Sequence, residues 1–170
     1  MLETASIALF LVLVGGLCSA LLRRAVEPAP SRQVPVPAVV PVAALGASVL
    51  ATCQLLGYGL IAVLALGTAE RGDEAVVMAL YDASAIAFVA SNVGLALLTG
   101  ATGLGLLFTG ARIAGIGSVL VAIVAAGASL TYAAEGAFSP HGDLGFTALI
   151  LQLLWTVAAA IALLRRSRTD

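Results

Sequence analysis

The sequence predicts an all-α fold: a polytopic membrane helical bundle of five transmembrane helices, with the N-terminus outside and the C-terminus in the cytoplasm. Composition gives the first reason. Of the 170 residues, 61% are hydrophobic and 10% are charged, which is too little polar surface for an ordinary soluble domain. The mean hydropathy of +1.12 agrees with this. The apolar residues also fall into runs of roughly 20 or more, the length at which a helix crosses the hydrocarbon core of a bilayer.

The second reason is the placement of the basic residues, which are all arginines. Seven of the eight follow every second apolar run, and only Arg71 departs from this alternation. The seven are Arg23, Arg24, Arg32, Arg112, Arg165, Arg166 and Arg168. Because cytoplasmic loops carry an excess of Lys and Arg, this pattern predicts the orientation of the chain. Six acidic residues then lie outside: Glu3, Glu70, Asp73, Glu74, Glu135 and Asp143.

The first apolar run, residues 4–22, predicts a retained transmembrane helix. Only Glu3 precedes this run, whereas a secretory signal begins with positive charge. Five of the six prolines then lie between Pro28 and Pro41. Residues 27–40 are therefore expected to form an extended, proline-rich cytoplasmic link.

The second span is expected over residues 41–67, with Pro41 in its first turn, where the missing N–H would be unpaired in any helix. At 1.5 Å per residue this helix measures ~40 Å, so it should tilt or protrude from the bilayer. The third span is expected over residues 79–108. Its helix starts outside the bilayer after Asp73, a residue suited to the N-cap.

Three glycines in the third span leave its continuity open. Gly100, Gly103 and Gly105 are expected to weaken or break the helix before Phe108. The fourth span is expected over residues 113–134, after a short turn. The fifth span is expected over residues 144–164, where Arg165 and Arg166 end it.

Small residues at a spacing of four predict the contacts between the helices. Helices in lipid gain little from hydrophobic burial against one another, so close packing requires such residues. Four predicted faces are Gly15 with Ser19, then Ala44, Ser48 and Thr52, then Ala87 with Ser91, and last Ser118, Ala122 and Ala126. An alanine-rich composition would generate part of this spacing by chance.

Five polar residues within or beside the spans are the candidate site residues: Gln54, Tyr58, Asp82, Asn92 and Gln152. One interpretation is a polar track for an ion or small solute, which enters at Asp82 and passes Asn92 about 15 Å deeper in the same helix. The other is that Asp82 is an interfacial carboxylate and that the amides form hydrogen bonds between helices. Trp155 is too deep for an interfacial aromatic residue and is expected to pack within the bundle.

The sequence contains few residues that could catalyse a reaction or bind a metal ion. Cys18 and Cys53 lie inside apolar runs and are expected to remain free thiols. His141 with Glu135 and Asp143 is weak evidence for a metal site, because zinc requires three or four fixed ligands. No catalytic residue, metal or cofactor is therefore expected.

The second half of the chain resembles a class of uncharacterised small polytopic integral membrane proteins of actinobacteria, over residues 75–166. The segments that carry the resemblance are Leu80-Tyr81-Asp82, Thr109-Gly110-Ala111-Arg112, Phe138-Ser139-Pro140, Gly145-Phe146, Leu154-Trp155 and Leu163-Leu164-Arg165-Arg166. The chain departs at Arg112, where it reads Arg-Ile-Ala-Gly and such proteins often carry a Pro-Arg-Trp sequence. The resemblance implies a bacterial inner-membrane protein and no assigned activity.

The functional expectation is a non-enzymatic interaction or assembly component of a membrane complex in a bacterial plasma membrane. Its partners would be the lipid bilayer and either a second copy of the chain or another membrane protein. A net charge of −1 gives no reason to expect nucleic acid. The alternative is a small-solute or ion channel or carrier, with a polar lining from the second, third and fifth helices.

Overall fold

The computed structural model describes residues 36–68, 73–108, 111–130 and 143–166, together with Val12, Gly15, Gly16 and Ser19. The four ranges contain α2 (Val36–Val63), η1 (Leu64–Thr68), α4 (Glu74–Phe108), α5 (Arg112–Ala128) and α6 (Asp143–Arg166), of which η1 is a π-helical segment. No strand occurs in these ranges, so the all-α class is confirmed for the described part of the chain. Of the expected first span, 4–22, only four helical residues are described, and the rest lies outside the described residues.

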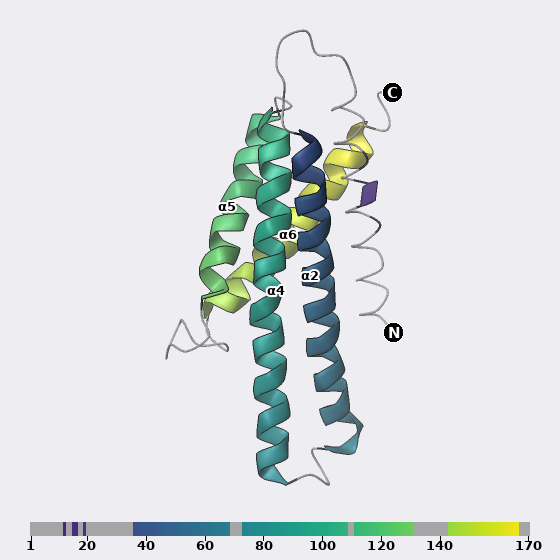
Figure 1. Ribbon diagram of the computed structural model, residues 1–170, viewed down its shortest axis with the longest axis vertical. Coiled ribbons are helices and arrows are strands. Elements are labelled where there is room, and N and C mark those ends of the chain that lie inside the picture. The colour runs from purple at the N-terminus through teal and green to yellow at the C-terminus, as the bar shows by residue number, and fades with distance from the viewer. Residues whose placement is uncertain are drawn as a thin grey trace.

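The central helix is α4, which packs against α2 along one side and against α5 along another (Figure 1). Both neighbours run antiparallel to α4, and α6 crosses the bundle diagonally. The start of α2, the end of α4, the start of α5 and the end of α6 lie at the same end of the bundle. At the other end, α2 and α4 extend beyond α5 and α6.

Helix α2 begins five residues earlier than expected, so the prediction of an extended link is wrong for residues 36–40. Residues 27–35 lie outside the described ranges. Pro41 lies inside the helix and not in its first turn, and its missing N–H deprives the Pro37 carbonyl of an intrahelical bond. The helix continues through this defect because Val39 and Ala43 are buried in the core, at 9% and 0% exposure.

Helix α4 begins at Glu74, directly after Asp73 as the sequence predicts, and it is unbroken to Phe108. Asp73 occupies the N-cap position: its backbone carbonyl accepts hydrogen bonds from the N–H groups of Val76 at 2.9 Å and Val77 at 3.1 Å. The helix is not broken at the glycines; Gly103 and Gly105 are buried, and Gly103 lies in close contact with α5.

Helix α5 ends at Ala128, and Ser129 and Leu130 form a turn, so the helix does not continue through residues 129–130 of the expected fourth span. Backbone bonds from Ser129 N to Ala125 O and from Leu130 N to Gly127 O close the last turn. Residues 131–134 lie outside the described ranges. Helix α6, Asp143–Arg166, contains the whole of the expected fifth span.

The contact between α2 and α4 brings their backbones together at two glycines. A Cβ atom on Gly46 would lie 2.5 Å from the backbone N of Leu98 and 2.7 Å from the carbonyl O of Gly94. A Cβ atom on Gly94 would overlap the backbone of Leu50 and lie 2.6 Å from the carbonyl O of Gly46. No side chain larger than hydrogen fits at either position without separating the helices.

The contact between α4 and α5 repeats this arrangement with another pair. A Cβ atom on Gly103 would lie 3.0 Å from the carbonyl O of Gly115 and 3.0 Å from the backbone N of Val119. A Cβ atom on Gly115 would lie 2.7 Å from Cγ of Leu107. In both contacts, each glycine therefore lies against the glycine of the neighbouring helix or against the residue four positions after that glycine.

The four predicted small-residue faces differ in outcome. On α2 the prediction is wrong: Ala44, Ser48 and Thr52 are exposed, whereas the helix packs through Ala43, Gly46, Ala47 and Leu50. Ala87 and Ser91 on α4 are buried as predicted. On α5, Ser118 is buried and Ala126 is exposed. Gly15 and Ser19 are exposed.

Two described helical segments are long and apolar enough to cross a membrane, Val39–Leu66 and Glu74–Phe108. The apolar segments Arg112–Ala128 and Thr147–Ala159 are shorter. Length and composition thus support membrane association for α2 and α4.

We expect Gly94→Ala to lower the free energy of unfolding by about 1–3 kcal/mol, because the added methyl forces α2 and α4 apart. The matched control is Gly59→Ala, since a Cβ atom at Gly59 meets nothing within 4 Å. There the change should be neutral or stabilising by up to about 1 kcal/mol, because alanine favours the helix. Reversible unfolding in detergent, followed by circular dichroism, measures both. Equal stability of the two variants would contradict the glycine contact.

Candidate functional site

The structure joins two of the five candidate site residues directly. Gln54 on α2 donates a hydrogen bond from Nε2 to Oε1 of Gln152 on α6, at 3.2 Å. Both side chains are partly buried, so each amide hydrogen bonds a polar group on another helix. The bond therefore connects α6 to α2. Gln54 lies one helical turn after Leu50, whose backbone is in close contact with Gly94 of α4.

Tyr58, the third candidate, packs against an aromatic side chain of α4. Its ring meets Phe88 edge-on, with the ring centroids 5.0 Å apart and the planes at 75°. A Cβ atom on the adjacent Gly57 would lie 3.0 Å from the same ring, so glycine lets Phe88 approach α2 closely. Edge-to-face pairs of this kind contribute about 0.5–1.5 kcal/mol beyond their buried area.

Asp82 and Asn92 do not join the amide pair. Asp82 is exposed near the start of α4. Asn92 is buried on α4, at 7% exposure. Because the two residues are separated by about 15 Å along α4, they share no direct contact.

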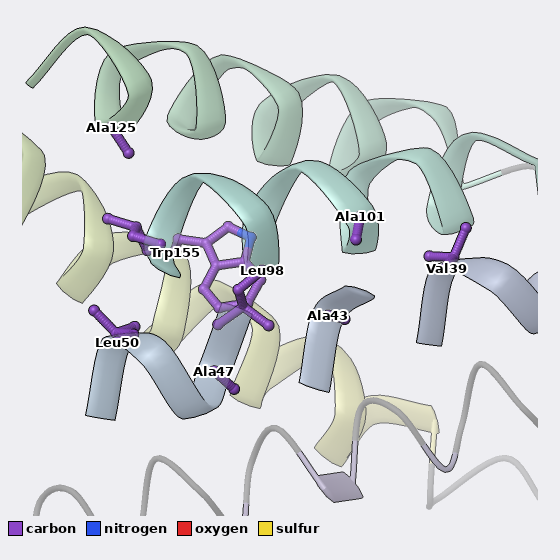
Figure 2. Packing of buried hydrophobic residues seen from close by; sticks show 9 residues of the cluster. Val39, Ala43, Ala47, Leu50, Leu98, Ala101, Ala125 and Trp155 are labelled. Carbon is purple, nitrogen blue, oxygen red and sulfur yellow. The ribbon is translucent and has the colours of Figure 1, made fainter. Parts of the chain in front are cut away.

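Trp155 makes the hydrogen bond that the sequence did not predict. Its indole Nε1 donates to Oγ of Ser118 on α5 at 2.8 Å, and both side chains are buried. The expectation that Trp155 packs within the bundle is confirmed, because it belongs to a core cluster with Leu50 of α2 and Leu98 of α4. Figure 2 shows its indole among the side chains of these helices. A sequence does not give the rotation of α5 against α6, so it contained no signal for the Ser118 partner.

The hydroxyl groups of α4 bond within their own helix, with one exception. Ser84 donates to the carbonyl of Tyr81, Ser91 to that of Phe88 and Thr99 to that of Leu95, at 2.6–2.7 Å. Thr102 is 1% exposed, and its hydroxyl has no partner among the described residues. Such intrahelical bonds satisfy the hydroxyls without providing a path from one helix to the next.

Five charged side chains whose exposure is described lie at the surface. Asp73, Glu74, Asp82, Arg112 and Asp143 are all exposed. The buried polar side chains are neutral: Ser84, Ser91, Asn92, Thr99, Thr102 and Ser118. The described interior can therefore orient helices through neutral hydrogen bonds, and it offers no charged group to an ion.

The described residues contain no group of three or more His, Cys, Asp or Glu side chains that could hold a metal ion. His141 and Glu135, considered above, lie outside the described residues. Cys53 is a free thiol and partly exposed, and Cys18 lies outside the described residues.

Comparison of the chain with protein-family models, with curated proteins and with solved structures found no match. The resemblance to small actinobacterial membrane proteins therefore stays a prediction.

A double-mutant cycle tests the Gln54–Gln152 bond. We expect Gln54→Leu and Gln152→Leu to show a coupling of about 0.6 kcal/mol, up to about 1.7 kcal/mol, in the free energy of unfolding in detergent. The reason is that each single variant leaves the other amide without its partner, whereas the double variant removes both groups. A control cycle pairs Gln54→Leu with Ser48→Ala, whose hydroxyl bonds its own helix, and should give no coupling. Additive effects of the two glutamine variants would show that the bond contributes nothing.

Proposed function

We propose that this chain is a multi-pass protein of a bacterial plasma membrane, and that it acts as a non-enzymatic interaction or assembly component of a membrane complex. In this proposal its partners are the lipid bilayer and either a further copy of the chain or another membrane protein. Neither a cofactor nor nucleic acid takes part. The resemblance of residues 75–166 to small actinobacterial membrane proteins supports the bacterial location.

The distribution of charge supports five spans with the N-terminus outside. Arg112 begins α5 and Arg166 ends α6 at one end of the bundle, whereas Asp73 and Glu74 lie at the other. The positive-inside rule assigns the arginine end to the cytoplasm. An outer N-terminus then requires an odd number of crossings, which the segment 4–22 completes.

One observation carries the interaction role: the polar groups that connect described helices are closed pairs. Gln54 pairs with Gln152, and Trp155 pairs with Ser118. Between these pairs the core is filled by apolar side chains such as Leu50 and Leu98, which have 0% exposure. A transport path requires polar groups that a solute can reach in sequence. Paired groups of this kind instead fix the register of the helices.

A channel or carrier remains the second candidate, and a specific observation favours it. Thr102 is buried on α4, and its hydroxyl has no partner among the described residues, while Asn92 is buried on the same helix. Unpaired buried polar groups are costly in an apolar bundle, and in membrane proteins such groups often contact a solute. The two are separated by about 15 Å along the helix, and Leu95 and Leu98 lie between them in the sequence and are fully buried.

Purification and flux measurements decide between the two candidates. We expect the chain, extracted with its native lipids, to carry a further polypeptide in a mass measurement of the intact complex. Sealed vesicles that contain only this chain should show no proton or solute flux. Asp82→Asn should change the free energy of unfolding by no more than about 1 kcal/mol, because the side chain is exposed. A flux that depends on the chain and disappears in Asp82→Asn or Asn92→Leu would support the transporter instead.

Orientation has its own test. A reporter that is active only in the cytoplasm, fused after Asp170, should be active. Gly72→Cys should react with a membrane-impermeant thiol reagent added outside, because positive-inside orientation places the acidic segment there. The unaltered chain is the control, since Cys18 and Cys53 lie within apolar runs. A silent reporter together with a protected cysteine would reverse the orientation.

A further inference from the structure

Helix α4 is too long to lie wholly inside a bilayer. Its 35 residues span about 52 Å, against ~30 Å of hydrocarbon. Even a tilt of 40°, the upper end of the usual range, reduces the span across the bilayer only to about 40 Å. One end of α4 must therefore stand outside the hydrocarbon.

The charges decide which end this is. Asp73, Glu74 and Asp82 lie at the start of α4, and no charged residue occurs from Ala83 to Ala111. The start of α4 packs against η1, which follows α2, and this end of the pair extends beyond α5 and α6 (Figure 1). We call residues 61–68 and 73–82 the hairpin tip.

The hairpin tip exposes large apolar side chains where water would surround it. Leu66 is 87% exposed, Met78 53%, Val76 49% and Ile61 42%. Exposed apolar side chains are normal in the hydrocarbon part of a membrane protein, but clustered outside it they mark an interaction surface. Something must therefore cover the tip in the assembled state.

The charge of the tip identifies the kind of occupant. The charged residues of the tip are Asp73, Glu74 and Asp82, a net charge of −3. A second copy in the same bilayer would bring its own acidic tip to the same height, where like charges repel. Anionic lipid headgroups are disfavoured for the same reason. A segment that is apolar and basic satisfies both the exposed side chains and the charge.

We propose that the hairpin tip is a docking surface for an apolar, basic polypeptide segment of another protein, on the side of the membrane that carries the acidic loops. The inference rests on the proposed function and names the chemistry of the partner. Apolar contacts with Leu66 and Met78 hold the segment, and lysine or arginine side chains face Asp73 and Glu74. Charge complementarity of this kind selects partners and speeds their encounter.

The test uses the full chain in phosphatidylcholine nanodiscs and two fluorescent helical peptides of equal length, one built from Leu and Lys and the other from Leu and Glu. Anisotropy measures binding, and empty nanodiscs give the lipid contribution. The Leu/Lys peptide should bind the loaded discs more tightly than the empty ones, and the Leu/Glu peptide should not. Binding should weaken as salt is raised, because the charges are exposed.

Variants locate the surface. The double variant Asp73→Asn with Glu74→Gln should weaken Leu/Lys peptide binding roughly fivefold to tenfold, as expected for the loss of two exposed charge pairs. Leu66→Ser should weaken it by a similar factor. Asp143→Asn, which removes an exposed carboxylate elsewhere, is the matched control and should leave binding unchanged.

Four results would overturn the docking surface: equal binding of the two peptides, equal binding by the tip variants, binding that empty discs reproduce, or no binding. A disulfide-linked dimer of Met78→Cys in the nanodisc would show that a second copy covers the tip, which also overturns it. These failures are distinct from failure of the proposed function. If the native complex still contains a further polypeptide, the partner binds elsewhere, whereas a chain that purifies alone and carries flux overturns both.

Discussion

The close approach of α4 to its two neighbours is the constraint on which the rest of the structure depends. Gly46 meets Gly94 at one contact, and Gly103 meets Gly115 at the other. Helices that are apolar on every side gain little preference for one neighbour from hydrophobic burial, so the fit of backbone against backbone selects the partner. Because α4 carries a glycine contact toward each neighbour, it becomes the central helix, and α6 packs across the layer that results.

This constraint explains which parts of the fold could be predicted. The helical class and the bounds of α6 follow from composition and from the arginines, and both were predicted. The packing face of α2 was not, because Ala44, Ser48 and Thr52 have the same spacing of four as the face around Gly46. A spacing of four shows that residues share one face of a helix, but it does not show which face turns toward the neighbouring helix. The glycines of α4 were expected to weaken or break the helix because local propensity disfavours them, whereas Gly103 lies in the close contact with α5.

The candidate site was predictable only as a set of residue types. The amides were expected to form hydrogen bonds between helices, and the structure joins Gln54 to Gln152. Trp155 was expected in the core, but its bond to Ser118 depends on how α5 and α6 face each other. Both bonds connect helices that share few backbone contacts with each other. The two bonds therefore fix the position of α6 along its neighbours. The glycine contacts fix the positions of α2, α4 and α5 relative to one another.

Charge then gives the two ends of the bundle different roles. Arginines flank the end where α5 begins and α6 ends, which in the proposed orientation is the cytoplasmic end. Carboxylates lie at the opposite end, where α2 and α4 extend beyond α5 and α6. A helix pair of this length could not be shortened to fit the bilayer without losing the apolar residues of the hairpin tip. The excess length, the exposed apolar side chains and the negative charge at that end together support the proposed partner outside the bilayer.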